Sequence, residues 1–172
     1  MDMTMSPGLR KAALCVHISC SVGWTGAVVT FLGLALIALT THDEVTARAM
    51  YVAMDALAWT VLVPLAVGSL VTGLVQSLGT VWGLTRHYWV VTKLVITLVA
   101  TVVLVLYTQT LAGLAKLAAA TGQEDQALTS ASPLVHVVLA LLLLLGATVL
   151  SVFKPKGLTA RGWRLQQQAR SA

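Results

Sequence analysis

The sequence predicts an all-α, polytopic membrane protein, an antiparallel bundle of four transmembrane helices with both termini in the cytoplasm. Hydrophobic residues make up 58% of the 172 residues and charged residues only 10%, whereas soluble proteins carry about 25% charged residues. The mean hydropathy is +0.87. The apolar residues also gather in four runs, each longer than the ~20 residues that cross the ~30 Å hydrocarbon core of a bilayer. We therefore expect the lipid bilayer to be the main partner of a single transmembrane domain.

Each apolar run is predicted to be a helix, although valine and threonine are frequent in it. A backbone exposed to lipid must satisfy its hydrogen bonds within its own segment, which a lone strand does not achieve. Short polar connectors make successive helices antiparallel neighbours. The predicted spans are 12–40, 50–78, 88–115 and 133–153, followed by a basic tail over 154–172.

The first two spans carry local features of their own. The run after Arg10-Lys11 imitates a secretory signal, but it greatly exceeds the ~7–15 apolar residues of such a signal, so we interpret it as a retained helix. Pro64 lies inside the second span, where the missing N–H group predicts a kink. In the tail, the segment Thr159–Arg170 is predicted either to form an interfacial helix or to serve only as a topology anchor.

Small residues in the first two spans suit close helix packing. In the first span these are Gly23, Gly26 and Gly33, and in the second they are Gly68 and the Ser69-x-x-x-Gly73 step. They fit best the packing between helices of one chain, and a homodimer or a larger membrane complex is the alternative.

The distribution of lysine and arginine predicts the orientation, because cytoplasmic loops carry an excess of these residues. The opposite side holds only Arg48 and Lys116, together with Asp43, Glu44, Glu124 and Asp125. The side that carries the termini holds eight cations: Arg10, Lys11, Arg86, Lys154, Lys156, Arg161, Arg164 and Arg170. This asymmetry places the chain in the plasma or inner cell membrane with both termini inside. It also explains the net charge of +5 without a nucleic-acid partner.

Aromatic residues near the ends of the spans fit the same orientation. Trp82, Tyr88 and Trp89 are expected at the cytoplasmic interface, and Tyr51 at the outer one, because amphipathic rings favour the level of the headgroups.

Four ionisable residues inside the spans are the candidate functional residues, because charged groups are costly in lipid. His17 and Lys93 each lie ~9 Å inward from the cytoplasmic side, counted at 1.5 Å per residue. Asp55 and His136 enter from the outer side, to depths of about 10 Å and ~6 Å. The bundle is thus predicted to contain two polar layers. Each also has a structural interpretation: Lys93 can extend to the headgroups, and Asp55 can simply pair with His136.

The inner layer is compatible with haem. A neutral histidine is a good ligand of haem iron, and two axial ligands lie roughly 4 Å apart, twice a metal–nitrogen bond of about 2 Å. His17 and His136 are expected ~11–15 Å apart along the membrane normal, so they cannot bind one iron together. His17 with an unprotonated Lys93 can do so. A zinc site is disfavoured, because the sequence shows no compact set of three ligands.

Two of the helices resemble those of a known membrane family. The step Trp89-x-x-x-Lys93-Leu94 is similar to the opening of a helix in HemJ-type protoporphyrinogen oxidases and related CopD-like membrane proteins. His17, followed by Gly23-Trp24-Thr25-Gly26, resembles their histidine-containing helix. The resemblance implies a haem b held by His17, as ligand of the iron, and by Lys93.

The chain also departs from that pattern. Val91 stands where HemJ-type chains usually carry a second histidine, and the dense histidine and methionine set of a copper carrier is missing from the sequence. Three functions therefore stay open at this point: a haem-binding redox protein, an accessory or assembly subunit without chemistry of its own, and a small transporter coupled to protons or metal ions. No catalytic residue is assigned.

Overall fold

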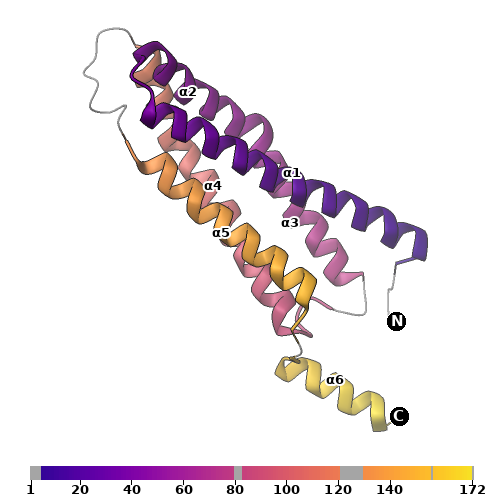
Figure 1. The fold of residues 1–172 in the computed structure, drawn as a ribbon. Helices are drawn as coiled ribbons and strands as arrows, with labels where there is room; N and C mark the ends of the chain where they lie inside the picture. Colours follow the sequence, from indigo (N-terminus) through magenta and orange to yellow (C-terminus); the bar gives the residue numbers. More distant parts are fainter. Residues whose placement is uncertain (1–4, 80–82, 121–129, 156, 172) are drawn as a thin grey trace.

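The computed structural model describes residues 5–79, 83–120, 130–155 and 157–171. It is all-α, with four long apolar helices packed antiparallel (Figure 1). The second of these is one continuous helix made of α2, the π-helical segment η1 and α3. The elements in chain order are α1 (Pro7–Thr40), α2 (Glu44–Leu57), η1 (Ala58–Leu62), α3 (Val63–Leu78), α4 (Tyr88–Ala119), α5 (Ser132–Phe153) and α6 (Ala160–Ser171). The predicted fold class is confirmed.

The four long helices form a closed ring in chain order. Helix α1 packs against α2–α3 and α5, and α4 packs against the same two neighbours. Helices α1 and α4 therefore lie diagonally across the bundle. The N-terminus of α1 and the C-terminal helix α6 lie at one end, and the α1–α2 connection lies at the other (Figure 1). We call these the terminal end and the α1–α2 end.

The helices extend beyond the predicted spans, because polar caps continue them. Helix α1 begins at Pro7 rather than at residue 12, and the Ser6 hydroxyl accepts a hydrogen bond from Leu9 N at 3.4 Å. A proline is well tolerated in the first turn, where its missing N–H has no intrahelical partner anyway. Helix α4 runs to Ala119 rather than to residue 115, with Lys116 in its last turn.

Helix α2 begins at Glu44 rather than at residue 50, because Asp43 caps it. The Asp43 carboxylate accepts hydrogen bonds from Val45 N at 3.3 Å and Thr46 N at 3.1 Å, and also from the Thr46 hydroxyl. These bonds, above all that from the Thr46 hydroxyl, hold the pKa of Asp43 below its ordinary value of about 3.9. The cap therefore stabilises the folded protein at pH values above the ordinary pKa of aspartate. This contribution is lost as the pH falls through the lowered pKa.

Pro64 coincides with a π-helical segment. Over Ala58–Leu62 the helix widens, and Val63 N donates to Ala58 O, five residues back. Proline lacks an N–H and its ring crowds the carbonyl four residues earlier, so the α-helical pattern cannot pass through it undisturbed. A π-turn is a common way to accommodate such a break. The structure thus has a π-turn on the N-terminal side of the proline at which the sequence predicts a kink.

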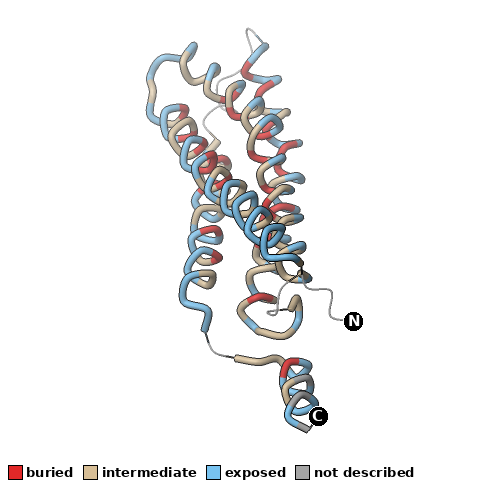
Figure 2. Tube along the Cα trace, turned by 90° about the vertical axis from the view of Figure 1, so that its right-hand side faces the viewer, coloured by how far each residue is buried: buried red, intermediate tan, exposed pale blue. Residues whose placement is uncertain are grey.

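Tight packing is concentrated towards the α1–α2 end (Figure 2). In the described part of α1 the buried residues begin at Trp24, in α3 they end at Ser69, and in α5 they end at Ala147. Towards the terminal end, α1 and α3 diverge from α4 and α5 (Figure 1). The bundle thus has a close-packed half and a more open half.

The outer faces of all four helices are apolar and exposed within the structure. In the most apolar window of each span, at most 28% of the residues are buried against the rest of the chain. Large apolar side chains such as Leu106 (67% exposed) and Val152 (70% exposed) point outward. Soluble monomers do not leave apolar surface of this extent uncovered, so the protein is an integral membrane protein whose helices contact lipid.

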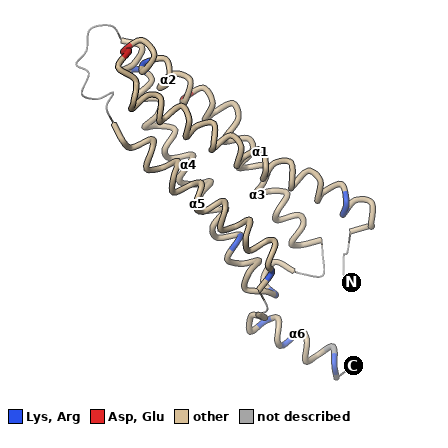
Figure 3. Tube along the Cα trace, in the orientation of Figure 1, with Lys and Arg blue, Asp and Glu red and all other residues tan. Residues whose placement is uncertain are grey.

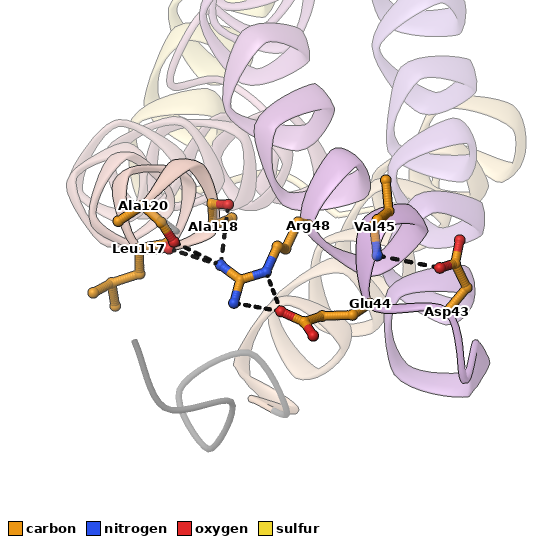
Figure 4. Close-up of polar contacts among 7 residues, drawn as sticks. All are labelled: Asp43, Glu44, Val45, Arg48, Leu117, Ala118 and Ala120. Carbon is orange, nitrogen blue, oxygen red and sulfur yellow. Dashed lines mark hydrogen bonds and ion pairs between the residues drawn. The ribbon is translucent and has the colours of Figure 1, made fainter. Parts of the chain in front are cut away.

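Arg48 joins α2 to the end of α4 (Figure 4). Its Nη1 donates to the carbonyl oxygens of Leu117 and Ala118 at 3.3 Å each and of Ala120 at 2.9 Å. Its Nε donates to Glu44 Oε1 at 2.7 Å, and its Nη2 lies 2.6 Å from the same oxygen. The last carbonyl groups of a helix have no N–H donors within the helix. The guanidinium of Arg48 supplies such donors and thereby caps the C-terminus of α4.

Charges are distributed as the sequence indicated. Lysine and arginine gather at the terminal end, and the acidic residues that the structure describes outside the spans lie at the α1–α2 end (Figure 3). Lys156, Glu124 and Asp125, which entered the comparison of the two sides, lie outside the described residues, as does Trp82.

The aromatic residues follow the expectation only in part. Tyr88 is 60% exposed at the start of α4, as an interfacial ring would be. The expectation for Tyr51 was wrong, because this residue is 1% exposed and packs in the core with Met54 and Ala58. Tyr51 lies on the inward face of α2, and depth along a helix does not determine which face a residue occupies.

We predict that Arg48→Met destabilises the protein by about 1.5–3 kcal/mol, the range for hydrogen bonds to charged groups. Glu44→Gln should cost less, because the Glu44 side chain is 58% exposed whereas that of Arg48 is 17% exposed. Thermal unfolding in one detergent compares the two variants with the wild type. Equal effects of both variants would show that the ion pair, and not the capping of α4, carries the contribution of Arg48.

Candidate functional site

The inner polar layer is a chain of contacts across the bundle. His17 on α1 places Nδ1 3.0 Å from the Thr72 hydroxyl oxygen on α3, and its Nε2 lies 3.4 Å from Lys93 Nζ on α4. Thr72 in turn donates its hydroxyl to Gly68 O at 2.6 Å. Three helices thus contribute to one site, and α1 meets α4 there across the diagonal of the bundle.

The contacts of Thr72 fix the tautomer of a neutral His17. A hydroxyl has one hydrogen to donate, and Thr72 uses it towards carbonyl oxygens of its own helix. Its oxygen must therefore accept from His17, so Nδ1 carries the ring proton. The other ring nitrogen, Nε2, then keeps its lone pair. This lone pair faces Lys93 and is available to a donor or to a metal ion.

Lys93 points into the bundle rather than along it. Its Nζ approaches His17, and its backbone oxygen accepts from Thr97 at 2.8 Å. Its ammonium group thus contacts His17 of the diagonal helix α1, whereas the sequence also allowed it to extend to the headgroups. The depth count from the sequence, which put His17 and Lys93 at one level, agrees with their contact.

A seam of small and polar residues between α1 and α3 supports the site. Ser21 and Ser69 share a hydrogen bond of 2.8 Å. A Cβ atom on Gly73 would lie 3.2 Å from His17 Cε1, and one on Gly68 would lie 3.0 Å from Cys20 Sγ. The small residues of α3 therefore serve packing within the chain, and the glycine at 73 makes room for the imidazole.

The outer layer is built around Tyr107 and His136. Their rings stack with centroids 3.9 Å apart and an interplanar angle of 17°. The Tyr107 hydroxyl lies 3.0 Å from Ser132 Oγ, and His136 Nδ1 lies 2.9 Å from Ser132 O. A carbonyl oxygen only accepts, so Nδ1 of a neutral His136 donates and its Nε2 keeps a lone pair.

Asp55 lies apart from these contacts. Its Oδ1 is buried and has no hydrogen-bond partner among the residues that the structure describes. The described hydrogen bonds of His136 run to Ser132 rather than to Asp55. The structure thus brings His17 and Lys93 together, while Asp55 and His136 share a half of the bundle without a hydrogen bond between them.

Sequence reasoning missed Thr72 and Tyr107 as members of these layers. Thr72 lies seven residues before Gly79, ~10 Å from the helix end at 1.5 Å per residue. That depth matches His17 and was a usable signal. Tyr107 lies eight residues before 115, the predicted end of its span, which is ~12 Å inward at 1.5 Å per residue. That depth is close to that of Asp55 and was a usable signal too.

Within the described residues no group of three histidine, cysteine, aspartate or glutamate side chains is placed to hold a metal ion. Searches against protein-family models, curated proteins and solved structures found no match to this chain. The case for a function therefore depends on the residues of the site itself.

We predict that a neutral His17 is protonated on Nδ1 and that Thr72→Val raises the population of the Nε2–H tautomer, because valine cannot accept the bond. Thr72→Ser should keep the wild-type tautomer. Nitrogen chemical shifts of ¹⁵N-histidine-labelled protein measure both. Thr148→Val is a matched control, since Thr148 donates to Leu144 O on α5 in the same way. An unchanged tautomer in Thr72→Val would refute the assignment.

Proposed function

We propose that this integral membrane protein binds haem b in its inner polar layer and takes part in electron transfer. The observation that carries the proposal is the contact between His17 Nε2 and Lys93 Nζ at 3.4 Å, between diagonal helices of a four-helix bundle. Bundle cores are a usual place for cofactors held by side chains of facing helices. The resemblance to HemJ-type helices points to the same two residues.

The residues present fit the donor set that a haem iron needs. His17 offers a lone pair on Nε2, and Thr72 holds the opposite side of the ring, which is the arrangement that orients a ligating histidine. His17 Nε2 and Lys93 Nζ lie 3.4 Å apart, and the flexible four-carbon stem of lysine would let Nζ move when the group binds. The helices also diverge towards this end of the bundle (Figure 1).

Each residue of the site then has a defined task. His17 would be the ligand of the iron, Lys93 would be the second ligand or a hydrogen-bond donor beside it, and Thr72 would position His17. A bound haem b would supply a one-electron couple between ferric and ferrous iron. The protein would supply the apolar surroundings and the fixed imidazole, which tune the potential of such a couple.

The same proposal includes the orientation. Both termini lie in the cytoplasm and the chain crosses the plasma or inner cell membrane four times. The excess of lysine and arginine at the terminal end supports this orientation through the positive-inside rule. The haem site would then lie in the cytoplasmic half of the membrane.

We expect wild-type protein, purified in detergent after expression with haem supplied, to show a Soret band, and His17→Ala to show none. Thr72→Val should bind haem about 10–100-fold more weakly, the usual cost of losing the partner that orients a ligand. Absorption spectra and a haem titration measure these effects.

His136→Ala is the matched control, because His136 is also a part-buried histidine whose Nδ1 donates to its own helix, but it lies in the other layer. Its haem content should equal that of the wild type. A colourless wild-type protein, or equal haem loss in His17→Ala and His136→Ala, would contradict the proposal.

A second candidate function is transport coupled to protons or metal ions, and Asp55 favours it. A buried carboxylate oxygen without a partner is costly, and Asp55 Oδ1 is such an atom in the described structure. A proton or a cation bound there would satisfy it. Ionisable groups that face the inside of a bundle commonly mark ion pathways.

We expect Asp55→Asn to reduce proton or metal flux into proteoliposomes about tenfold or more if this candidate is correct, since a tenfold effect requires only about 1.4 kcal/mol. Asp43→Asn is the control, because asparagine caps a helix as well as aspartate does and Asp43 is exposed. Flux in the Asp55 variant equal to that of the control would exclude the candidate.

A further inference from the structure

The C-terminal tail and the start of α4 enclose a basic pocket at the terminal end. Its volume is about 420 Å³, which is enough for a headgroup or a small ligand. None of its lining residues carries a carboxylate. The pocket is lined by Arg86, His87, Trp89, Lys154, Pro155, Gly157, Leu158 and Gln166.

Backbone hydrogen bonds hold the walls of this pocket together. Tyr88 N donates to Gly157 O at 3.3 Å, and Thr159 N donates to Arg86 O at 3.1 Å. His87 and Leu158 form an isolated antiparallel bridge between the same two segments. The tail is therefore attached to the start of α4 along its backbone, and the pocket is a defined part of the fold.

Helix α6 docks against the same segment through Gly162. A Cβ atom at this position would lie 2.3 Å from Arg86 O, so only glycine permits the approach. The Thr159 hydroxyl accepts from Gly162 N at 3.2 Å and caps α6. The glycine therefore allows α6 to pack closely on Arg86. Arg86 is one of the two cationic residues that line the pocket, and Lys154 is the other.

Lys154 supplies the other cation from an unusual backbone conformation. It ends α5 with φ 42° and ψ 62°, the left-handed region, which is uncommon for residues with a side chain and is usually occupied by glycine at a helix end. The chain thus has a lysine where glycine would be easier to accommodate.

The chemistry of the pocket suits a phosphate group. Arginine and lysine bind phosphate through charge and N–H donors, and Trp89 belongs to the aromatic residues that favour the headgroup level. Two exposed apolar residues directly precede Lys154 in the chain: Val152 and Phe153 on α5 are 70% and 77% exposed. A free phosphate would make no use of these side chains, whereas acyl chains would cover them.

We propose that this pocket binds the phosphate of an anionic phospholipid, with its acyl chains along the apolar faces of α4 and α5. Basic pockets at the ends of transmembrane helices are a known way of holding such headgroups. The proposal is independent of haem binding, because its residues are not those of the inner polar layer.

The test measures binding of phosphatidylglycerol to detergent-purified full-length protein, with lipid retention counted by native mass spectrometry. The pocket variant is Arg86→Gln with Lys154→Asn, since asparagine tolerates the left-handed conformation. The control is Arg10→Gln with Lys11→Gln, which removes the same charge from the terminal end outside the pocket. We expect about tenfold weaker binding in the pocket variant and less than about twofold change in the control.

Gly162→Leu provides a second variant that changes no charge. It should displace α6 and weaken binding of phosphatidylglycerol as well. Equal loss in the pocket variant and in the control would mean general surface attraction and would overturn the proposal. If inorganic phosphate displaces phosphatidylglycerol and binds with the same affinity, the pocket is a site for free anions. That result would overturn the assignment to lipid.

Discussion

Polar groups inside this protein must find their partners within the chain, because the surrounding hydrocarbon offers none. The backbone meets this requirement by forming helices. Serine and threonine hydroxyls meet it by donating to carbonyl oxygens one turn back, as Thr97, Thr101 and Thr148 do. Histidine side chains meet it within a helix, as His136 does with Ser132 O, or across helices, as His17 does with Thr72 and Lys93. The second contact joins three helices at the terminal end.

The two halves of the bundle satisfy this requirement differently. The half near the α1–α2 end is close-packed around Tyr51, Met54 and Leu111, which are all buried. At this end Arg48 donates hydrogen bonds to the last carbonyl groups of α4. The half near the termini has few fully buried side chains among its described residues, and polar contacts of His17 with Thr72 and Lys93 join three of its helices. Open, polar regions of a fold are where ligands and functional motions are usually found. The candidate haem site and the basic pocket both lie there.

The spans, their antiparallel order and the level shared by His17 and Lys93 were predictable, because they follow from apolar runs and from a fixed rise per residue. The helix ends at Pro7 and Glu44 were not, because caps such as Ser6 and Asp43 read as ordinary connector residues in the sequence. Burial of Tyr51 was missed because depth does not reveal the face of a helix. Thr72 was missed as a partner of His17, because the hydroxyl of a threonine in an apolar run ordinarily donates to a carbonyl oxygen of its own helix.

The π-turn at Ala58–Leu62 lies between two helical segments that both pack against α1 and α4. Arg48 on α2 reaches the end of α4, whereas Ser69 and Thr72 on α3 face α1. A π-turn holds about one residue more than an α-turn. Loss of a single residue within 58–62 would therefore let both flanking faces keep their neighbours. The same loss elsewhere in α2 or α3 would rotate one segment against the other by about 100°. At this segment the chain can therefore lose one residue without a change in the orientation of α3, which carries Thr72, relative to α2.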